Sequence, residues 1–122
     1  MISEYYLNVD WNYVYKKLKK YPRNIISIVK RDITLLKYNP ESGDKLDSFK
    51  TATLYKKRYQ EIEAYYTVEV GVVQVLGFEY LGKINLEGIE SGIKSGKYTK
   101  HTTTKQQNTI KAYKKKFRQK YI

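Results

Sequence analysis

The sequence contains no cysteine and a single histidine, His101. Without cysteine the chain has no disulfide, no cysteine-ligated zinc and no thiolate nucleophile. One histidine cannot supply both a catalytic triad and a metal site, and His101 is expected in a polar loop. We therefore predict no catalytic residue, no metal and no cofactor. The lack of cysteine also agrees with a reducing, cytoplasmic location.

Long apolar runs are missing as well. The most apolar stretch, Val68 to Leu81, is interrupted by Glu69 and Gln74, and it is too short and too polar to cross a membrane. The first ten residues, MISEYYLNVD, include an early acid and no apolar run of signal-peptide length. We therefore expect a cytoplasmic protein with no membrane partner.

The acids show no catalytic pattern. Glu61 and Glu63 would point apart on a helix, because residues two apart do not share a face. Asp44 and Asp47 are expected at a loop edge, where they would cap a helix. The chain also lacks the phosphate-binding loop GxxxxGK[ST]. These observations predict that the protein is not an enzyme.

The whole chain has a formal net charge of +12, and its last part contains no negatively charged residue. No acid follows Glu90. The cations there are Lys94, Lys97, Lys100, Lys105, Lys111, Lys114, Lys115, Lys116, Arg118 and Lys120. Because each neutralised phosphate releases condensed counterions, this segment favours nucleic acid. We predict a nucleic-acid-binding C-terminal region on a nearly neutral body.

Apolar residues at helical spacing follow Asp10, which is a candidate N-cap. Pro22 interrupts the pattern, so either one helix bends there or a second helix begins with Pro22 in its first turn. We favour one bent helix. Its apolar stripe would form core or a homodimer seam. The seam residues are Trp11, Val14, Leu18, Ile25 and Val29.

The middle of the chain is ambiguous. Turn signals from Tyr38 to Asp44 predict a loop, and a helix is expected from about Asp47 or Ser48 to Tyr66. The alternation of valines from 68 to 72 indicates a strand, but residues 65–80 also fit a helical repeat. Local signals favour the strand, and the wider pattern favours a helix. We predict a mostly α fold, with an α+β fold carrying a strand or hairpin around residues 66–84 as the alternative.

The C-terminal part is predicted to hold two helices. Asn85 can cap a short helix, a basic loop would follow from Ser91 to His101, and a threonine at 102–104 can cap a helix from about Lys105 to Tyr121. The apolar face of that last helix is Ile110, Tyr113, Phe117 and Tyr121. The chain would thus comprise an N-terminal helical region, 1–77, and a basic region, 78–122, in one compact unit.

The last helix combines amides in its first turns with cations in its later turns. Amides pair with adenine in the major groove, and lysine pairs with guanine or phosphate, so this order suits a recognition helix. The candidate nucleic-acid-binding residues are Lys97, Lys100, Thr104, Lys105, Gln106, Gln107, Asn108, Lys111, Lys114, Lys115 and Arg118.

Three segments carry a resemblance to a known family. FEYLGKINLEGIE, from Phe78 to Glu90, resembles the first half of the helix-turn-helix of sigma factor region four, and KQQNTIKAYKKKFRQKY, from Lys105 to Tyr121, resembles its second half. LKKYPRNIISIVKRDI, from Leu18 to Ile33, resembles the N-terminal region of phage late transcription regulators of the RinA and ArpU type. The resemblance implies a helical transcription regulator in the host cytoplasm. Its implied partners are double-stranded DNA and RNA polymerase or another host nucleoprotein.

A different function class fits the same charge. The chain could be a small basic phage-type protein that binds or inhibits a host nucleic-acid-processing machine such as a nuclease, or that binds RNA. Tyr98 and Tyr113 are suited to stacking on single-stranded bases. A strand within 68–81 would favour this alternative over the helical regulator.

Overall fold

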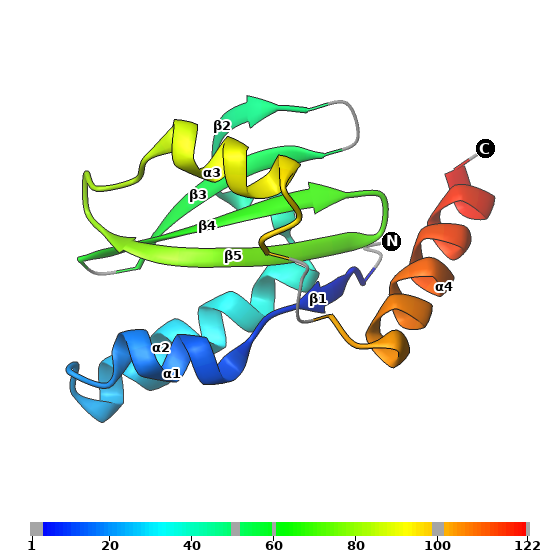
Figure 1. Ribbon diagram of the computed structural model, residues 1–122. Helices are drawn as coiled ribbons and strands as arrows, with labels where there is room; N and C mark the ends of the chain where they lie inside the picture. The colour runs from blue at the N-terminus through cyan, green and yellow to red at the C-terminus, as the bar shows by residue number, and fades with distance from the viewer. Residues whose placement is uncertain (1–3, 50–51, 60, 99–101, 122) are drawn as a thin grey trace.

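The computed structural model of the protein describes residues 4–49, 52–59, 61–98 and 102–121, the last three of these by their backbone alone. It has an α+β fold, in which a five-stranded sheet carries helices on both faces (Figure 1). The predicted mostly helical fold is therefore wrong, and the sheet extends well beyond the hairpin of the α+β alternative. The elements are β1 (Tyr6–Asn8), α1 (Trp11–Leu18), α2 (Arg23–Thr34), short 3-10 turns Leu35–Lys37 and Pro40–Ser42, β2 (Asp44–Ser48), β3 (Thr53–Tyr59), β4 (Ile62–Glu69), β5 (Val72–Tyr80), α3 (Leu86–Lys94) and α4 (Thr104–Tyr121).

The sheet is mixed, with the strand order β1-β5-β4-β3-β2. β1 runs parallel to β5, and the other neighbours are antiparallel. β4 and β5 form a hairpin whose turn places Gly71 at a φ of 76°, a conformation that costs glycine little and other residues much. β1 pairs with the start of β5, and the Tyr6 N–H donates to the Gly71 carbonyl at 2.9 Å, so the β4–β5 turn lies beside β1.

The predicted helix from about Asp47 to Tyr66 is instead β2, β3 and most of β4. The apolar residues of this segment resembled a helical pattern because β4 is covered on both faces. Every residue from Ile62 to Thr67 is buried. A strand buried on both faces loses the alternation that marks a strand in sequence. Its tyrosines, threonine and valine nevertheless suit a pleated surface.

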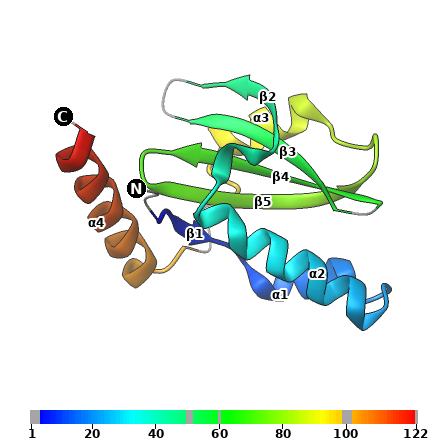
Figure 2. The ribbon, with the colours of Figure 1, turned by 180° about the vertical axis from the view of Figure 1, so that it is seen from behind.

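α1 and α2 cover one face of the sheet (Figure 2). The bent single helix is wrong, because α1 ends at Leu18 and the extended Pro22, with φ −57° and ψ 151°, precedes α2. Val14, Leu18 and Val29 are each at most 1% exposed and pack against the sheet. The residues predicted as a homodimer seam therefore belong mainly to the core of the monomer.

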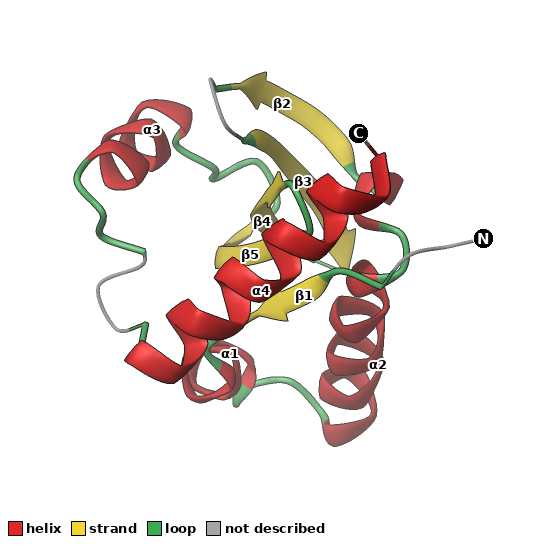
Figure 3. Cartoon of the chain, turned by 90° about the vertical axis from the view of Figure 1, so that its right-hand side faces the viewer, coloured by secondary structure: helices red, strands yellow, loops and turns green. Residues whose placement is uncertain are grey.

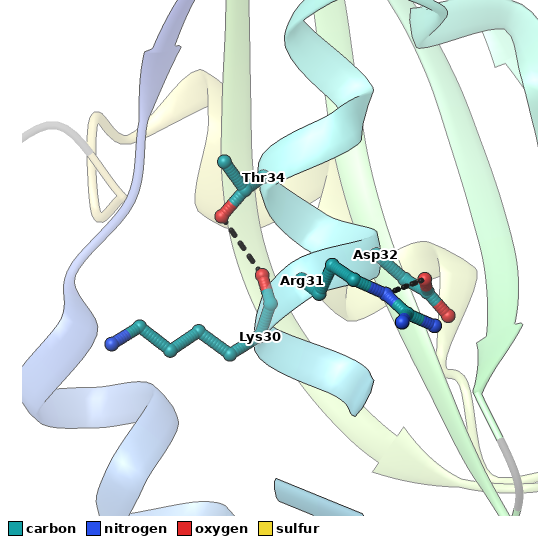
Figure 4. A network of polar contacts seen from close by, with 4 residues as sticks. All are labelled: Lys30, Arg31, Asp32 and Thr34. Atoms are coloured by element: carbon teal, nitrogen blue, oxygen red, sulfur yellow. Dashed lines mark hydrogen bonds and ion pairs between the residues drawn. The ribbon is translucent and has the colours of Figure 1, made fainter. Parts of the chain in front are cut away.

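The C-terminal end of α2 is exposed and held by local contacts (Figure 4). The Thr34 hydroxyl donates to the Lys30 carbonyl at 2.8 Å, one turn earlier. Arg31 and Asp32 approach to 3.6 Å in an ion pair whose arginine side chain is largely exposed. Such surface pairs contribute little to stability, so this helix is held mainly by its buried stripe.

α3 lies on the opposite face of the sheet, and α4 packs at the end that carries β1 and the β4–β5 turn (Figure 3). The two helices do not form a helix-turn-helix. Within the described ranges, no helix is long and apolar enough to cross a membrane. The predicted division at residue 77 falls inside β5, whose last three residues belong to the predicted basic region.

Candidate active site

A hollow of about 220 Å³ lies on the α3 side of the sheet. It is lined by Tyr65, Glu79, Lys83, Asn85, Gly88, Ile89, Lys97 and Tyr98. β4 supplies Tyr65, β5 supplies Glu79, and the segments before and after α3 supply two lysines and Tyr98. A carboxylate, two ammonium groups and two phenols thus line one small space.

The strand register explains why charged residues gather on this face. Glu63 on β4 is the partner of Glu79 on β5 and of Arg58 on β3, and Tyr65 is the partner of Lys56. Directly paired residues of neighbouring strands point to the same face of a sheet. The α3 face therefore carries two carboxylates and two cations beside Tyr65.

Glu63 fixes the turn that carries Lys83. Its carboxylate accepts a hydrogen bond from the Gly82 N–H at 2.9 Å and lies 3.2 Å from the Lys56 ammonium. The side chain is almost fully buried, yet the Gly82 hydrogen bond and Lys56 hold the pKa of Glu63 below its ordinary value. Glu63 is therefore a charged positioning residue for the segment after β5.

Replacing Glu63 with glutamine should lower the free energy of unfolding at pH 7 by about 1–2 kcal/mol, because glutamine accepts the Gly82 bond without charge. The folded-state pKa of Glu63 is lowered, so its contribution is present above the unfolded pKa of about 4.3 and is lost as pH falls through the folded value. In urea unfolding measured from pH 7 to pH 3, the free energies of unfolding of the wild type and Glu63→Gln should converge as the pH falls. Glu61→Gln, at an exposed position, should unfold like the wild type at all pH values.

α3 is fixed over the sheet by apolar and acidic contacts. Ile89 and Ile93 pack in a second core cluster with Leu54 of β3. The carboxyl of Glu90 hydrogen-bonds that of Asp47 on β2, which raises the pKa of Glu90 and lowers that of Asp47. The segments flanking α3, which carry Lys83 and Lys97, are thereby placed over the sheet.

Tyr65 and Tyr98 form the wall between the two sides of the site. Their rings meet edge to face, with centroids 6.4 Å apart. Burial raises the pKa of both phenols, and a side-chain hydrogen bond joins them. A Cβ on Gly92 would lie 2.7 Å from the Tyr98 ring, so the bare backbone of α3 lets that ring approach.

A larger hollow of about 530 Å³ lies on the other side of this wall. It shares Tyr65, Lys97 and Tyr98 with the first hollow. Its remaining lining comes from the end of β1, the start of α1, the middle of β5 and the start of α4. The two hollows form a continuous polar and aromatic surface around Tyr98.

α4 holds most of the residues predicted to bind nucleic acid. The helix begins within one residue of the prediction, and Thr103 caps it: the Gln106 N–H donates to the Thr103 hydroxyl at 3.1 Å, and the Gln106 side chain accepts from the Thr103 N–H at 2.9 Å. Gln106 is therefore occupied in this capping box. The exposed members are Thr104, Lys105, Gln107, Asn108, Lys111, Lys115 and Arg118.

One of the predicted nucleic-acid-binding residues, Lys114, instead helps to hold α4 against the sheet. Lys114 lies 2.5 Å from the Glu69 carboxylate at the end of β4. Phe117 and Tyr113 contact Tyr5 and Tyr6, with ring centroids 4.7 Å and 5.5 Å apart. Of the other predicted residues, Lys97 lines both hollows, and Lys100 lies outside the described residues.

Sequence reasoning missed the two groups that dominate the smaller hollow, Glu79 and Lys83. The expected signal would have been alternation along strands, which places Lys56, Arg58 and Glu63 on one face with Glu79. The prediction of a helix from about Asp47 to Tyr66 concealed this alternation. Among the described residues, no group of three or more His, Cys, Asp or Glu could hold a metal ion.

No protein-family model matches the chain, and no curated protein does. Two solved structures are similar. A chain of the archaeal RelE–RelB complex from Pyrococcus horikoshii OT3 has a TM-score of 0.56 and 22% identity, over 66% of this chain and 99% of that chain. A double mutant of the E. coli toxin RelE in the free state has a TM-score of 0.47 and 18% identity, over 75% of this chain and 97% of that chain.

The archaeal likeness shows the fold, and it contradicts the expected identity. The predicted relationship to RinA- and ArpU-type phage regulators with a region-four helix-turn-helix is wrong. The expected DNA-binding regulator of transcription, with double-stranded DNA and RNA polymerase as partners, is contradicted with it. The expectation that the chain is not an enzyme is contradicted too. The alternative that involved RNA or nucleic-acid machinery agrees better with the findings, and the chain shares the fold of a RelE–RelB complex component.

Proposed function

We propose that this chain is an endoribonuclease of the RelE toxin type, which cleaves messenger RNA at the ribosome. The observation that carries the proposal is the convergence of Glu79, Lys83, Lys97, Tyr65 and Tyr98 on one hollow of about 220 Å³. The fold similarity to a chain of the archaeal RelE–RelB complex supports the assignment to the RelE type.

The side chains suit transfer of a phosphodiester to the neighbouring 2′-hydroxyl. The Glu79 carboxylate takes the proton of that hydroxyl, whose oxygen then attacks the adjacent phosphorus. Lys83 and Lys97 offset the charge that develops on the phosphate oxygens. Tyr98, which lines the same hollow and is hydrogen-bonded to Tyr65, donates its proton to the departing 5′-oxygen. The products are a 2′,3′-cyclic phosphate and a 5′-hydroxyl end.

The exposed cations of α4 extend the RNA-binding surface. Lys105, Lys111, Lys115 and Arg118 lie on an exposed helix beyond the larger hollow. Cations on a helix surface follow a phosphate backbone without reading its sequence. We assign these residues, with Lys97 and the amides Gln107 and Asn108, to the RNA on either side of the cleaved bond.

A protein partner and a location follow from the same proposal. The net charge of +12 favours an acidic partner, and the archaeal neighbour was solved as a complex of RelE with RelB. We propose that an inhibitory protein binds this chain in a comparable way. Action on ribosomes would place the protein in the cytoplasm.

The test is cleavage of a labelled messenger RNA, with the purified protein added to a reconstituted translation system or to the RNA alone. We expect new RNA ends, with 2′,3′-cyclic phosphates, in the translating sample. Lys83→Met should lower the initial rate about 10²–10³-fold, as expected when a group that stabilises a developing oxyanion is removed.

Lys16→Met is the matched control, because it removes the same charge from an exposed position on α1. It should cleave at the wild-type rate. If the folded wild-type protein produces no new ends with or without ribosomes, the proposed reaction is wrong. If Lys83→Met and Lys16→Met cleave equally well, the site lies elsewhere.

A further inference from the structure

We infer that Tyr13 of α1 is a positioning residue for the departure of the 5′-oxygen, and that it acts through Tyr65 on the acid Tyr98. This inference rests on the proposed function, which assigns the acid to Tyr98. Tyr13 lines the larger hollow, on the far side of the wall that Tyr65 and Tyr98 form. A residue of α1, which covers the opposite face of the sheet, thereby reaches the phenols of the α3 face.

The shortness of β1 opens the route for this side chain. β1 pairs with β5 only from Val72 to Gln74, and beyond Gln74 that edge of β5 has no strand partner among the described residues. α1 follows β1 closely and contacts β5. Asp10 fixes its first turn by accepting a hydrogen bond from the Tyr13 N–H at 3.2 Å. The first turn of α1 is therefore held beside the free edge of β5.

The Tyr13 side chain passes over this edge. Its ring stacks on Phe78, which belongs to the core under α1 and α2, with centroids 6.4 Å apart and planes inclined by 25°. Its hydroxyl lies 3.1 Å from the point where a Cβ on Gly77 would stand. Gly77 is the register partner of Tyr65, so that point lies on the α3 face. One side chain thus connects the two faces around the edge of β5.

The missing side chain of Gly77 lets two phenols meet. A Cβ at this position would collide with the Tyr65 hydroxyl and press on the Tyr13 hydroxyl. Gly77 is not among the glycines with a positive φ, so glycine is needed here for space and not for the backbone angle. Both phenol oxygens therefore lie over the same bare position of β5.

The charge interactions of the phenols agree with this closeness. Burial is the main cause of the raised pKa of Tyr65, and a negative charge on Tyr13 is the next cause, ahead of Tyr98 and Glu79. Tyr13 also raises the pKa of Tyr98, after burial. Tyr13 is thus electrostatically connected to both phenols of the wall.

The three phenols form a chain that can stabilise the acid after it has reacted. Once Tyr98 has given its proton to the 5′-oxygen, its own oxygen is negative and can only accept hydrogen bonds. The hydroxyl of Tyr65, which is hydrogen-bonded to Tyr98, then donates to it, and the Tyr65 oxygen accepts from Tyr13. No further proton is transferred. The two O–H groups point toward the phenolate, and this charge-assisted chain favours release of the leaving group.

Tyr13→Phe tests this role, because phenylalanine keeps the ring on Phe78 and removes only the hydroxyl. The single-turnover rate of cleavage should fall about tenfold, the lower end of the value of a hydrogen bond to a charged group. The affinity for a 2′-O-methyl RNA should stay unchanged. Tyr15→Phe is the matched control, since it removes a hydroxyl from a tyrosine of the same helix that is 40% exposed, and it should cleave at the wild-type rate.

A sulphur-containing RNA separates help to the acid from support of the fold. Sulphur replaces the bridging 5′-oxygen at the bond that the translation assay identifies. A thiol has a pKa of about 8.5, so a thiolate departs without being protonated. Wild type, Tyr13→Phe and Tyr98→Phe should cleave this RNA at equal rates, whereas Lys83→Met should remain slow. A Tyr13→Phe defect that is as large with sulphur as with oxygen would overturn the inference.

A double variant tests whether Tyr13 acts through Tyr98. Adding Tyr13→Phe to Tyr98→Phe should lower the rate no further, because the chain of phenols has already lost its end. Multiplied effects of the two changes, or a Tyr13→Phe protein that cleaves at the wild-type rate, would overturn the inference and leave the proposed enzyme intact. A folded wild-type protein that produces no new RNA ends would instead refute the proposed enzyme, and the role of Tyr13 with it.

Discussion

Glu79→Gln is expected to lower the single-turnover rate of RNA cleavage about 10²–10⁴-fold, the usual contribution of a general base. Glutamine has nearly the same shape as glutamate but cannot take the proton of a 2′-hydroxyl. Glu79 lies on β5 in the lining of the hollow that also holds Lys83, Lys97 and both tyrosines. The rate should be measured with protein in excess over the programmed ribosomes.

Measurement of RNA affinity should distinguish a chemical role of Glu79 from a role in positioning the RNA. The affinity of Glu79→Gln for a 2′-O-methyl RNA should be equal to or slightly higher than that of the wild type, because a negative charge is removed from a phosphate-binding surface. Glu87→Gln, at an exposed position of α3, makes the same charge change and should leave the rate unaltered. A Glu79→Gln protein that cleaves at the wild-type rate would exclude Glu79 as the base.

The helices could be predicted where their signals are local. Asp10 caps α1, with the Tyr13 N–H donating to its carboxylate at 3.2 Å, and Asn85 caps α3 through the Gly88 N–H at 3.2 Å. The apolar face of α4 was placed correctly at Phe117, which is 5% exposed. Caps and helical spacing depend on residues within one or two turns, so a single sequence contains the information.

The sheet could not be predicted in the same way, because its burial pattern depends on distant segments. β4 is buried on both faces only because α1 and α2 cover one side and α3 covers the other. Tyr59, Ile62 and Tyr66 then fall at helical spacing by coincidence. The candidate site has the same origin: Tyr65 and Glu79 meet Lys97 only after β4 pairs with β5 and α3 docks. The basic C-terminal run indicated Lys97, but nothing local indicated Glu79.

Phe78→Ala should cost about 3–5 kcal/mol of unfolding free energy, the range for truncating a buried phenylalanine. Phe78 is 1% exposed on the face of β5 that carries α1 and α2, and it packs in the main core cluster. The truncation removes apolar contact and leaves a cavity between the sheet and α1. Urea unfolding followed by fluorescence and circular dichroism should show a lower midpoint with an unchanged slope.

Tyr80→Ala is the matched control, since Tyr80 is an aromatic residue of the same strand that is 46% exposed. The Lys20 ammonium lies 4.0 Å from the centroid of its ring, and loss of this exposed contact should cost only about 1 kcal/mol. The consequence of Phe78→Ala reaches the larger hollow, because Tyr13 stacks on Phe78 and lines that hollow. A Phe78→Ala protein as stable as Tyr80→Ala would show that α1 is not held on the sheet through this ring.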